Sequence, residues 1–400
     1  MNESEKINKK LLKWLKDNNL ELNDENLAKF FELHNSHALD KEDKDNEEIS
    51  DELFDKAMET EDYDERISLL EEALEYNPDN LDAYVSYVYL TSRDDALNKL
   101  IKKEKEYAKK HFSKKFIEEN KGEFYYILET RPYLRLLFNI GEEYINSDDY
   151  ENGVKTFEKI IELNNNDNMG VRYRLSGLYL FLERFEEFNN LWDHYKKDSS
   201  SMKIADLYLY NVLNKDKRNA NKYLKLLYKS NFFTYLSLSA LYLPHADDSP
   251  SRFAPGSVEE TMVYIEEHHE LIFDLMNKDV LKIKEVDTDI IFNGSIELFY
   301  LNFALASNPE KFYNKKFSKS EIAKEMNSPD KKIILETFNL KKFSHEDIDK
   351  LLDIAIKENF LIKADENRFM ITEKFNGVVL ILSDIFNDER EENSSDNNLA

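Results

Sequence analysis

Apolar residues recur along most of the chain at the three- and four-residue spacing of amphipathic helices. The spacing first appears between Lys6 and His34, where it predicts two short helices. It returns near Glu47 and continues in successive segments that contain few glycines or prolines. The run from Asp40 to Asp51 is strongly acidic and predicts an exposed linker, because like charges repel and bury no apolar surface. The whole pattern predicts a mostly α-helical protein.

The segment from Glu61 to Asn80 has the features of one particular helical repeat. Tyr63 lies where a tight turn joins two helices, Ala73 where the helices come into close contact, and Pro78 where the second helix ends. These residues resemble the second half of a tetratricopeptide repeat. A single unit of this kind cannot bury its apolar face, so the resemblance implies neighbouring repeats stacked into a solenoid with a concave binding face.

The same spacing predicts four repeats and two weaker helix pairs. The second repeat is shortened before Ala96 and continues into a long helix, rich in lysine and glutamate, that ends near Phe116. In the third repeat Gly141 takes the small position where two helix axes approach closely. The predicted units are Glu47–Asn80, a unit that begins at Leu81, Tyr133–Asn168, Met169–Ser199, and weaker pairs at Ala205–Lys229 and Val258–Met276.

The pattern changes near Glu310, where helices give way to a short hairpin. Serine caps predict helices that begin at Ser318 and Ser344, with another at Lys331–Phe338 between them. The alternation at Arg368–Thr372 predicts a strand after a turn. Helices followed by a short β-hairpin indicate a winged-helix-like module.

These predictions combine into an all-α fold, a tetratricopeptide-repeat α-solenoid with a small C-terminal winged-helix-like α+β module. Residues 244–255 contain three prolines and no periodicity, which predicts a loop. We expect N-terminal helices and the acidic linker at 1–46, the solenoid at 47–276, connecting helices at 277–309, the winged-helix-like module at 310–385, and a disordered acidic tail at 386–400.

Composition and charge limit the compartment and the partners. The 400 residues include no cysteine, which excludes disulfides, thiolate zinc sites and cysteine nucleophiles and fits a reducing compartment. No segment has the length of uncharged sequence that a membrane span requires. The formal net charge of −26 repels phosphate backbones, so nucleic-acid partners are not expected. We expect a cytoplasmic protein without membrane contact, whose partners are proteins or peptides of basic or mixed charge.

Two segments that open successive repeats carry the residues best suited to hold a partner. The guanidinium groups of Arg131 and Arg135 can grip a carboxylate in a bidentate manner, and Pro132 suits a first helical turn. Because equivalent positions of neighbouring repeats are adjacent in a solenoid, we expect one groove that receives an acidic or C-terminal carboxylate segment. The predicted partner-binding residues are Glu129, Arg131, Tyr133, Arg135, Asp167, Asn168, Arg172 and Tyr173.

Both segments also have an explanation within the fold itself. Arg131 and Arg135 can form intramolecular ion pairs with Glu129 or with nearby acids, and so hold adjacent repeats together. Asp167 or Asn168 can cap the helix that follows. The sequence leaves these alternatives open.

Three segments, occurring in a fixed order, carry a closer family resemblance. Residues 129–135 (ETRPYLR), residues 166–173 (NDNMGVRY) and the stretch from Pro255 to Tyr264 resemble bacterial tetratricopeptide proteins similar to the eukaryotic suppression-of-tumorigenicity-type family. The resemblance covers about residues 47–276. It departs at Met169, where the family usually has glutamine, and at Tyr125, where it usually has tryptophan. It implies an α-helical interaction protein without an established catalytic activity.

Motifs for catalysis or metal binding are missing from the sequence. The histidine pairs His34/His37 and His268/His269 lack supporting ligands, so we expect them to be solvated or locally bonded. Gly256 stands alone, and there is no glycine-rich phosphate loop or nucleophile elbow. We therefore expect that the protein is not an enzyme and needs no cofactor or metal.

The predicted function is that of a non-catalytic adaptor or scaffold that binds a partner segment on the concave face of the repeats. The alternative is a transcription-related regulator with a ligand-sensing repeat domain and a C-terminal module that contacts DNA. Residues 310–374 carry 14 basic and 13 acidic side chains, so this region escapes the acidity of the rest. The helix at His345–Phe360, however, has five acidic side chains and two lysines, which disfavours insertion into a DNA groove and favours protein docking.

Overall fold

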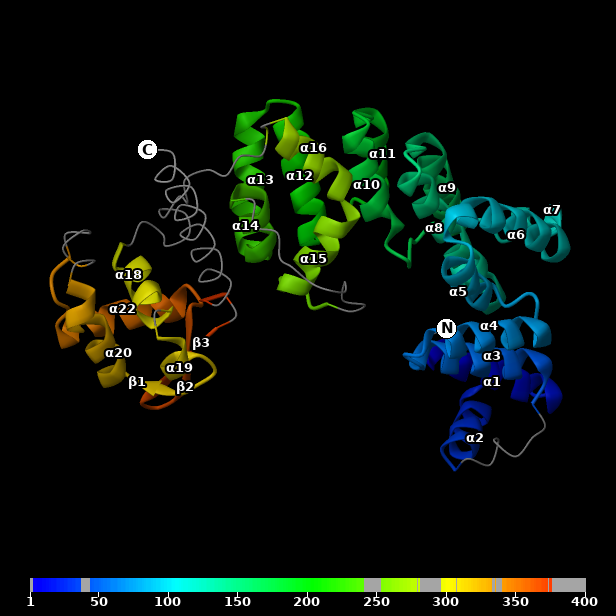
Figure 1. Ribbon diagram of the computed structural model, residues 1–400, viewed down its shortest axis with the longest axis horizontal. Coiled ribbons are helices and arrows are strands. Elements are labelled where there is room, and N and C mark those ends of the chain that lie inside the picture. The colour runs from blue at the N-terminus through cyan, green and yellow to red at the C-terminus, as the bar shows by residue number, and fades with distance from the viewer. Residues whose placement is uncertain are drawn as a thin grey trace. The chain divides into compact units, whose positions relative to one another are not determined.

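The computed structural model describes most of the chain and is mainly helical, as predicted (Figure 1). Its contacts divide the chain into two compact units, Met1–Trp192 and Asp193–Ala400. The predicted tail at 386–400, most of the predicted loop at 244–255 and part of the predicted helix at 331–338 lie outside the described residues. The described residues are 3–36, 44–240, 253–278, 280, 296–306, 308–332, 335, 340–372 and 374–375.

The first unit begins with the two predicted helices, which pack against each other. Helix α1 spans Glu3–Asp17 and α2 spans Asp24–Asn35. Asn23 begins α2, where its side chain accepts a hydrogen bond from the backbone N–H of Asn26 and satisfies a donor that the helix leaves unpaired. The two helices share a cluster of buried apolar side chains, Leu11, Trp14, Leu15 and Phe30.

The predicted acidic linker ends before Asp51, which corrects the sequence analysis. Asp45 begins α3 (Asn46–Glu59) through a capping box, in which its carboxylate accepts the backbone N–H of Glu48 and the Glu48 carboxylate accepts that of Asp45. The second half of the acidic run is therefore helical, because acidic groups in a first turn complement the helix dipole. Residues 40–43 of the run lie outside the described part of the chain.

Helices α3 and α4 (Tyr63–Tyr76) form the first pair. Ala73 is fully buried where they meet, and the hydroxyl of Ser50 on α3 donates a hydrogen bond to its carbonyl oxygen over 2.7 Å. So close an approach leaves room only for a small side chain, which confirms the predicted place of Ala73. Helix α4 ends two residues before Pro78, also as predicted.

The second pair consists of α5 and α6, and here the predicted long helix is wrong at its end. It stops at His111 instead of near Phe116. The hydroxyl oxygen of Ser113 accepts the backbone N–H of Phe116 and so begins a separate short helix, α7. The bounds are Leu81–Thr91 for α5, Ala96–His111 for α6 and Lys114–Glu119 for α7.

The third pair, α8 (Arg131–Asn146) and α9 (Tyr150–Leu163), is held together at two glycines. A Cβ atom on Gly141 would lie 2.7 Å from the ring of Phe157, and one on Gly153 would overlap a side chain of α8. Non-bonded carbons prefer separations of about 3.5–4.0 Å, so both positions favour glycine. The predicted close helix contact at Gly141 is confirmed.

Two further helices, α10 and α11, occupy the predicted fourth repeat, and helices α12 to α16 follow in the described part of the second unit up to Asn277. The pairs α12/α13 and α15/α16 were predicted, but α14 was not. Its residues are buried almost all round, so it lacks the polar face that marks an amphipathic helix. The bounds are Val171–Phe181 for α10, Phe185–His194 for α11, Ser201–Leu213 for α12, Lys217–Ser230 for α13, Phe232–Ala240 for α14, Val258–Glu267 for α15 and His269–Asn277 for α16.

The C-terminal part of the second unit combines helices with a three-stranded antiparallel sheet of order β1-β3-β2. Ser318 begins α20 and Ser344 begins α22, each through a capping box, as predicted. Strand β3 coincides with the predicted strand. The bounds are Ile296–Ala306 for α18, Pro309–Phe312 for α19, Phe317–Ser318 for β1, Lys319–Met326 for α20, His345–Lys357 for α22, Leu361–Asp365 for β2 and Arg368–Ile371 for β3.

Candidate protein-binding face of the repeats

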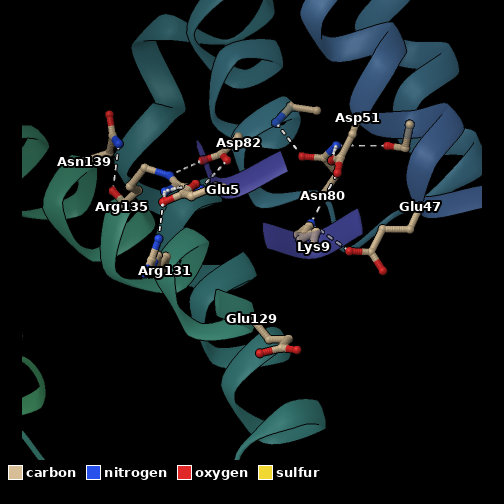
Figure 2. A network of polar contacts seen from close by, with 12 residues as sticks. Glu5, Lys9, Glu47, Asp51, Asn80, Asp82, Glu129, Arg131, Arg135 and Asn139 are labelled. Atoms are coloured by element: carbon tan, nitrogen blue, oxygen red, sulfur yellow. Dashed lines mark hydrogen bonds and ion pairs between the residues drawn. The ribbon is translucent and has the colours of Figure 1, made fainter. Parts of the chain in front are cut away.

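Helix α8 presents a row of polar side chains to its neighbours. Pro132 lies in its first turn, where the missing N–H costs no hydrogen bond. Arg131, Arg135 and Asn139 follow at four-residue spacing and therefore lie on one face of the helix. Figure 2 shows that Arg131 and Arg135 point toward a carboxylate of α1, the side chain of Glu5.

Arg135 joins two helix pairs through a bidentate contact. Its Nε and Nη2 atoms donate to the two carboxylate oxygens of Asp82 on α5 over 2.8 and 2.7 Å. Burial by itself lowers the pKa of the Arg135 guanidinium, but Asp82 and Glu5 outweigh burial and raise the pKa above its ordinary value. The charged form is thus fixed in place by the fold.

Glu5 completes the arrangement from the distant N-terminal helix. Its side chain is only 5 % exposed, and its oxygens accept from Nη1 of Arg131 at 3.3 Å and from Nη1 of Arg135 at 3.2 Å. Arg131 is held separately, because its Nε donates to the carbonyl oxygen of Tyr125 over 2.7 Å and its guanidinium lies 4.5 Å from the centre of that ring. Two arginines therefore converge on one sheltered carboxylate.

The α3 end of the same surface is acidic and receives the lysines of α1. Lys9 donates to Glu47 over 2.8 Å and to Asp51 over 3.2 Å. Lys13 binds Asp45 and Glu48, the capping residues at the start of α3. Lys6 binds Asp55, one turn further along α3 than Asp51. Burial by itself lowers the pKa of Lys9, but Asp51 and Glu47 outweigh it and raise the pKa. Complementary charges thus line the whole contact.

The side chains of this surface belong to the first helices of three successive pairs, of which α1 contacts α3 through Lys9 and α8 through Glu5. Asp51 lies on α3, Asp82 on α5 and Arg135 on α8. We call the surface that carries these three side chains the first-helix face. Asn80 supports it at the acidic end, where its side-chain amide donates to a carboxylate oxygen of Asp51 over 3.2 Å.

Two residues of the first predicted segment lie away from this face. Tyr133 is 3 % exposed, and its hydroxyl donates to Glu104 over 2.6 Å and accepts from Lys159 over 3.0 Å, within the packing of α6, α8 and α9. It is therefore a core residue and does not line a groove, which corrects the prediction. Glu129 is exposed and lies apart from the two arginines (Figure 2).

The second predicted segment caps its own helix. Asp167 is 3 % exposed, and its carboxylate accepts the backbone N–H groups of Val171 and Arg172 over 2.8 and 2.9 Å. Burial raises the pKa of Asp167, against the lowering effect of Arg172. The Arg172 guanidinium lies 3.0 Å from Asp167 and 4.3 Å from the centre of the Tyr173 ring, whereas Asn168 is exposed. The contacts of Asp167 are local, with residues four and five positions further along the chain, so the alternative of helix capping is confirmed for Asp167.

Sequence reasoning missed Glu5 and Asp82, which meet the predicted arginines. A signal for Glu5 exists, because Glu5, Lys9 and Lys13 recur at four-residue spacing in a helix whose other side is apolar. The acidic residues of α3 show the matching spacing. Neither pattern, however, reveals that these helices pair with each other.

One of the four histidines named in the sequence analysis, His268, does not lie on the surface. His268 is fully buried, with Nδ1 2.9 Å from the carbonyl oxygen of Tyr264 and Nε2 2.7 Å from Asp206. It is thus locally bonded and not solvated. No cluster of potential metal ligands occurs among the described residues.

A family model described as tetratricopeptide repeat matches residues 134–167, which cover most of α8 and all of α9. The protein contains a tetratricopeptide repeat. No curated protein matches the chain. The closer resemblance to the suppression-of-tumorigenicity-type family stays a prediction. Within the part of the chain that the structure describes, no helix is long and apolar enough to cross a membrane.

Proposed function

We propose that the protein is a non-catalytic adaptor or scaffold that binds a segment of a partner protein on the concave face of its repeats. Tetratricopeptide repeats generally mediate protein–protein interactions, and the matched repeat contains Arg135. The first-helix face, built from the first helix of each pair, is our candidate for the concave face. A reducing, cytoplasmic location fits the cysteine-free sequence.

One observation carries this proposal: the first-helix face already holds a helix. Arg131 and Arg135 each donate through Nη1 to the carboxylate of Glu5, more than a hundred positions away, which is the charge-assisted contact that suits a partner's acidic group. The predicted internal pairing of these arginines is also observed, and it does not exclude partner binding. The carboxylate that α1 places between the two arginines is the same kind of group that a partner would have to supply.

We propose a protein-docking role for the C-terminal module, which we interpret as winged-helix-like. The sheet order β1-β3-β2 and the helix directly before the hairpin support this interpretation. The exposed surface of α22 carries acidic side chains, among them Glu346, Asp349 and Asp353. Phosphate backbones would be repelled there, so the alternative of a DNA-contacting regulator is disfavoured.

Affinity capture from cells tests the proposal. The full chain serves as bait, next to an Arg131→Ala/Arg135→Ala variant and a matched Arg218→Ala/Lys222→Ala control, which removes two exposed positive charges from α13. Partner proteins should be captured by the wild type and the control and be depleted at least about tenfold with the first variant, since sheltered charge-assisted contacts contribute about 1.5–3 kcal/mol each. Equal capture by all three baits would reject the first-helix face as the binding surface.

A further inference from the structure

We propose that α1 is a built-in occupant of the first-helix face, and that a partner binds there by presenting a helix of the same chemistry in place of α1. This inference rests on the proposed function and names the regulation and the partner class of the same site. The expected partner helix carries one carboxylate near its start, followed by lysines at four-residue spacing, as Glu5, Lys9 and Lys13 do in α1.

Helix α1 is divided into two faces with different tasks. Glu5, Lys9 and Lys13 lie on one side and contact the first-helix face. Leu11 and Trp14 lie on the opposite side and pack against α2. The apolar face of α1 is therefore buried against α2, and its charged face contacts the repeats.

The contact between α1 and the repeats is of a kind that a competitor can replace. The side chains of Lys6, Lys9 and Lys13 remain between a quarter and about a third exposed. Ion pairs in such positions contribute little net stability each, and salt screens them. Only the Glu5 carboxylate is deeply sheltered. The arrangement is specific in its charge pattern.

The first-helix face keeps its shape without α1. Arg135 retains its bidentate contact with Asp82, and Arg131 retains the carbonyl and ring of Tyr125. Asp51 retains the amide of Asn80. The buried cluster around α3 and α4 includes no residue of α1. The receptor surface is thus pre-organised, which lowers the cost of binding a second helix.

Charge order also fixes the direction of the incoming helix. The arginines meet Glu5 near the start of α1, whereas Lys9 and Lys13, further along α1, meet carboxylates nearer the start of α3. Lys6, directly after Glu5, also meets a carboxylate of α3, that of Asp55. A helix of reversed direction would place its carboxylate beside Glu47 and Asp51 and its lysines beside arginines. Like charges at such contacts are disfavoured, so the face selects both sequence pattern and orientation.

Binding of a labelled synthetic peptide of residues 1–36 to the full chain tests the inference. The wild type is compared with Lys9→Glu/Lys13→Glu, which sets α1 against the acidic end of the face, and with Glu5→Arg, which sets it against the arginines. The matched control, Lys16→Glu/Lys29→Glu, makes the same charge change at exposed positions of the hairpin. Circular dichroism of each variant verifies that it is folded, and fluorescence anisotropy gives the dissociation constant.

Both undocked variants should bind the peptide at least about tenfold more tightly than the wild type and the control, because apparent affinity is proportional to the fraction of chains whose site is open. Adding Asp51→Lys to either undocked variant should abolish the gain in affinity for the peptide. Equal binding by all chains, or a gain that survives Asp51→Lys, would overturn the inference. A wild-type dimer in light scattering, with α1 of one copy on the other, would overturn the intramolecular assignment. If capture from cells still depends on Arg131 and Arg135, the proposed function stands when this inference fails.

Discussion

Replacement of Gly141 by alanine tests the packing that builds the repeats. The added Cβ atom would lie 2.7 Å from two ring carbons of Phe157, whereas non-bonded carbons prefer about 3.5–4.0 Å. The ring has to move by roughly 1 Å, but it is fully buried and its centre lies 5.5 Å from that of the Phe138 ring. Overpacking costs about 1–3 kcal/mol, and alanine recovers about 1 kcal/mol of helix propensity.

Because the added carbon meets two atoms of a fully buried ring, the cost lies in the upper part of that range. We expect Gly141→Ala to lower the free energy of unfolding by about 1–2 kcal/mol. Urea denaturation followed by circular dichroism measures this as a fall of the midpoint by roughly 0.5–1 M, given the usual dependence of stability on urea.

A double-mutant cycle with Phe157→Leu shows whether the ring is responsible. Leucine lacks the ring carbons that Gly141→Ala would meet, so in this background the alanine should be neutral or stabilising, by up to about 1 kcal/mol. A close contact between the added carbon and the Phe157 ring is ruled out if Gly141→Ala alone leaves the midpoint unchanged or raises it, or if its cost is the same in both backgrounds.

Three further predictions concern local groups. Asp45→Ala removes the capping box of α3 and should cost about 1 kcal/mol in urea denaturation; no change would exclude this carboxylate from a capping role. Asp167→Ala takes the acceptor from two backbone N–H groups of α10 and from Arg172, and should cost about 1–2 kcal/mol in the same assay, whereas unchanged stability would contradict its role as a cap. Burial lowers the pKa of Lys374 from 10.5 to about 8, against a weaker raising effect of Glu358. The unfolded chain therefore binds more protons between these values, so wild-type stability relative to Lys374→Met should rise from pH 8 to pH 10.5, and a constant difference in thermal melts would contradict this.

Local chemistry explains why much of the fold was predictable. A serine before an acidic residue three positions later, as at Ser318 and Ser344, begins a helix through contacts within one turn. The small residues Ala73 and Gly141 indicate where helices approach. Helix α14 was not predicted because a segment buried almost all round has no apolar stripe. The end of α6 was predicted too late in the chain because the helical spacing continues across Ser113.

Only one side of the candidate site, the pair of arginines, could be predicted from the sequence. The forked side chains of Arg131 and Arg135 indicate affinity for a carboxylate, and the structure places one between them. The owner of that carboxylate, Glu5, lies far away in sequence, and no local pattern specifies so distant a pairing. Tyr133 shows the opposite difficulty, since an aromatic residue beside charged ones fits either a surface or a core until the neighbouring helices are placed.

Photo-cross-linking shows directly whether partners bind the first-helix face. The chain has no cysteine, so a single cysteine at Asn139 can carry a photoreactive maleimide beside Arg135, and one at Lys155, exposed on α9, serves as control. We predict cross-links to partner proteins from position 139 that depend on Arg135 and are largely missing from position 155. Partners that cross-link equally or only from position 155 would contradict this prediction.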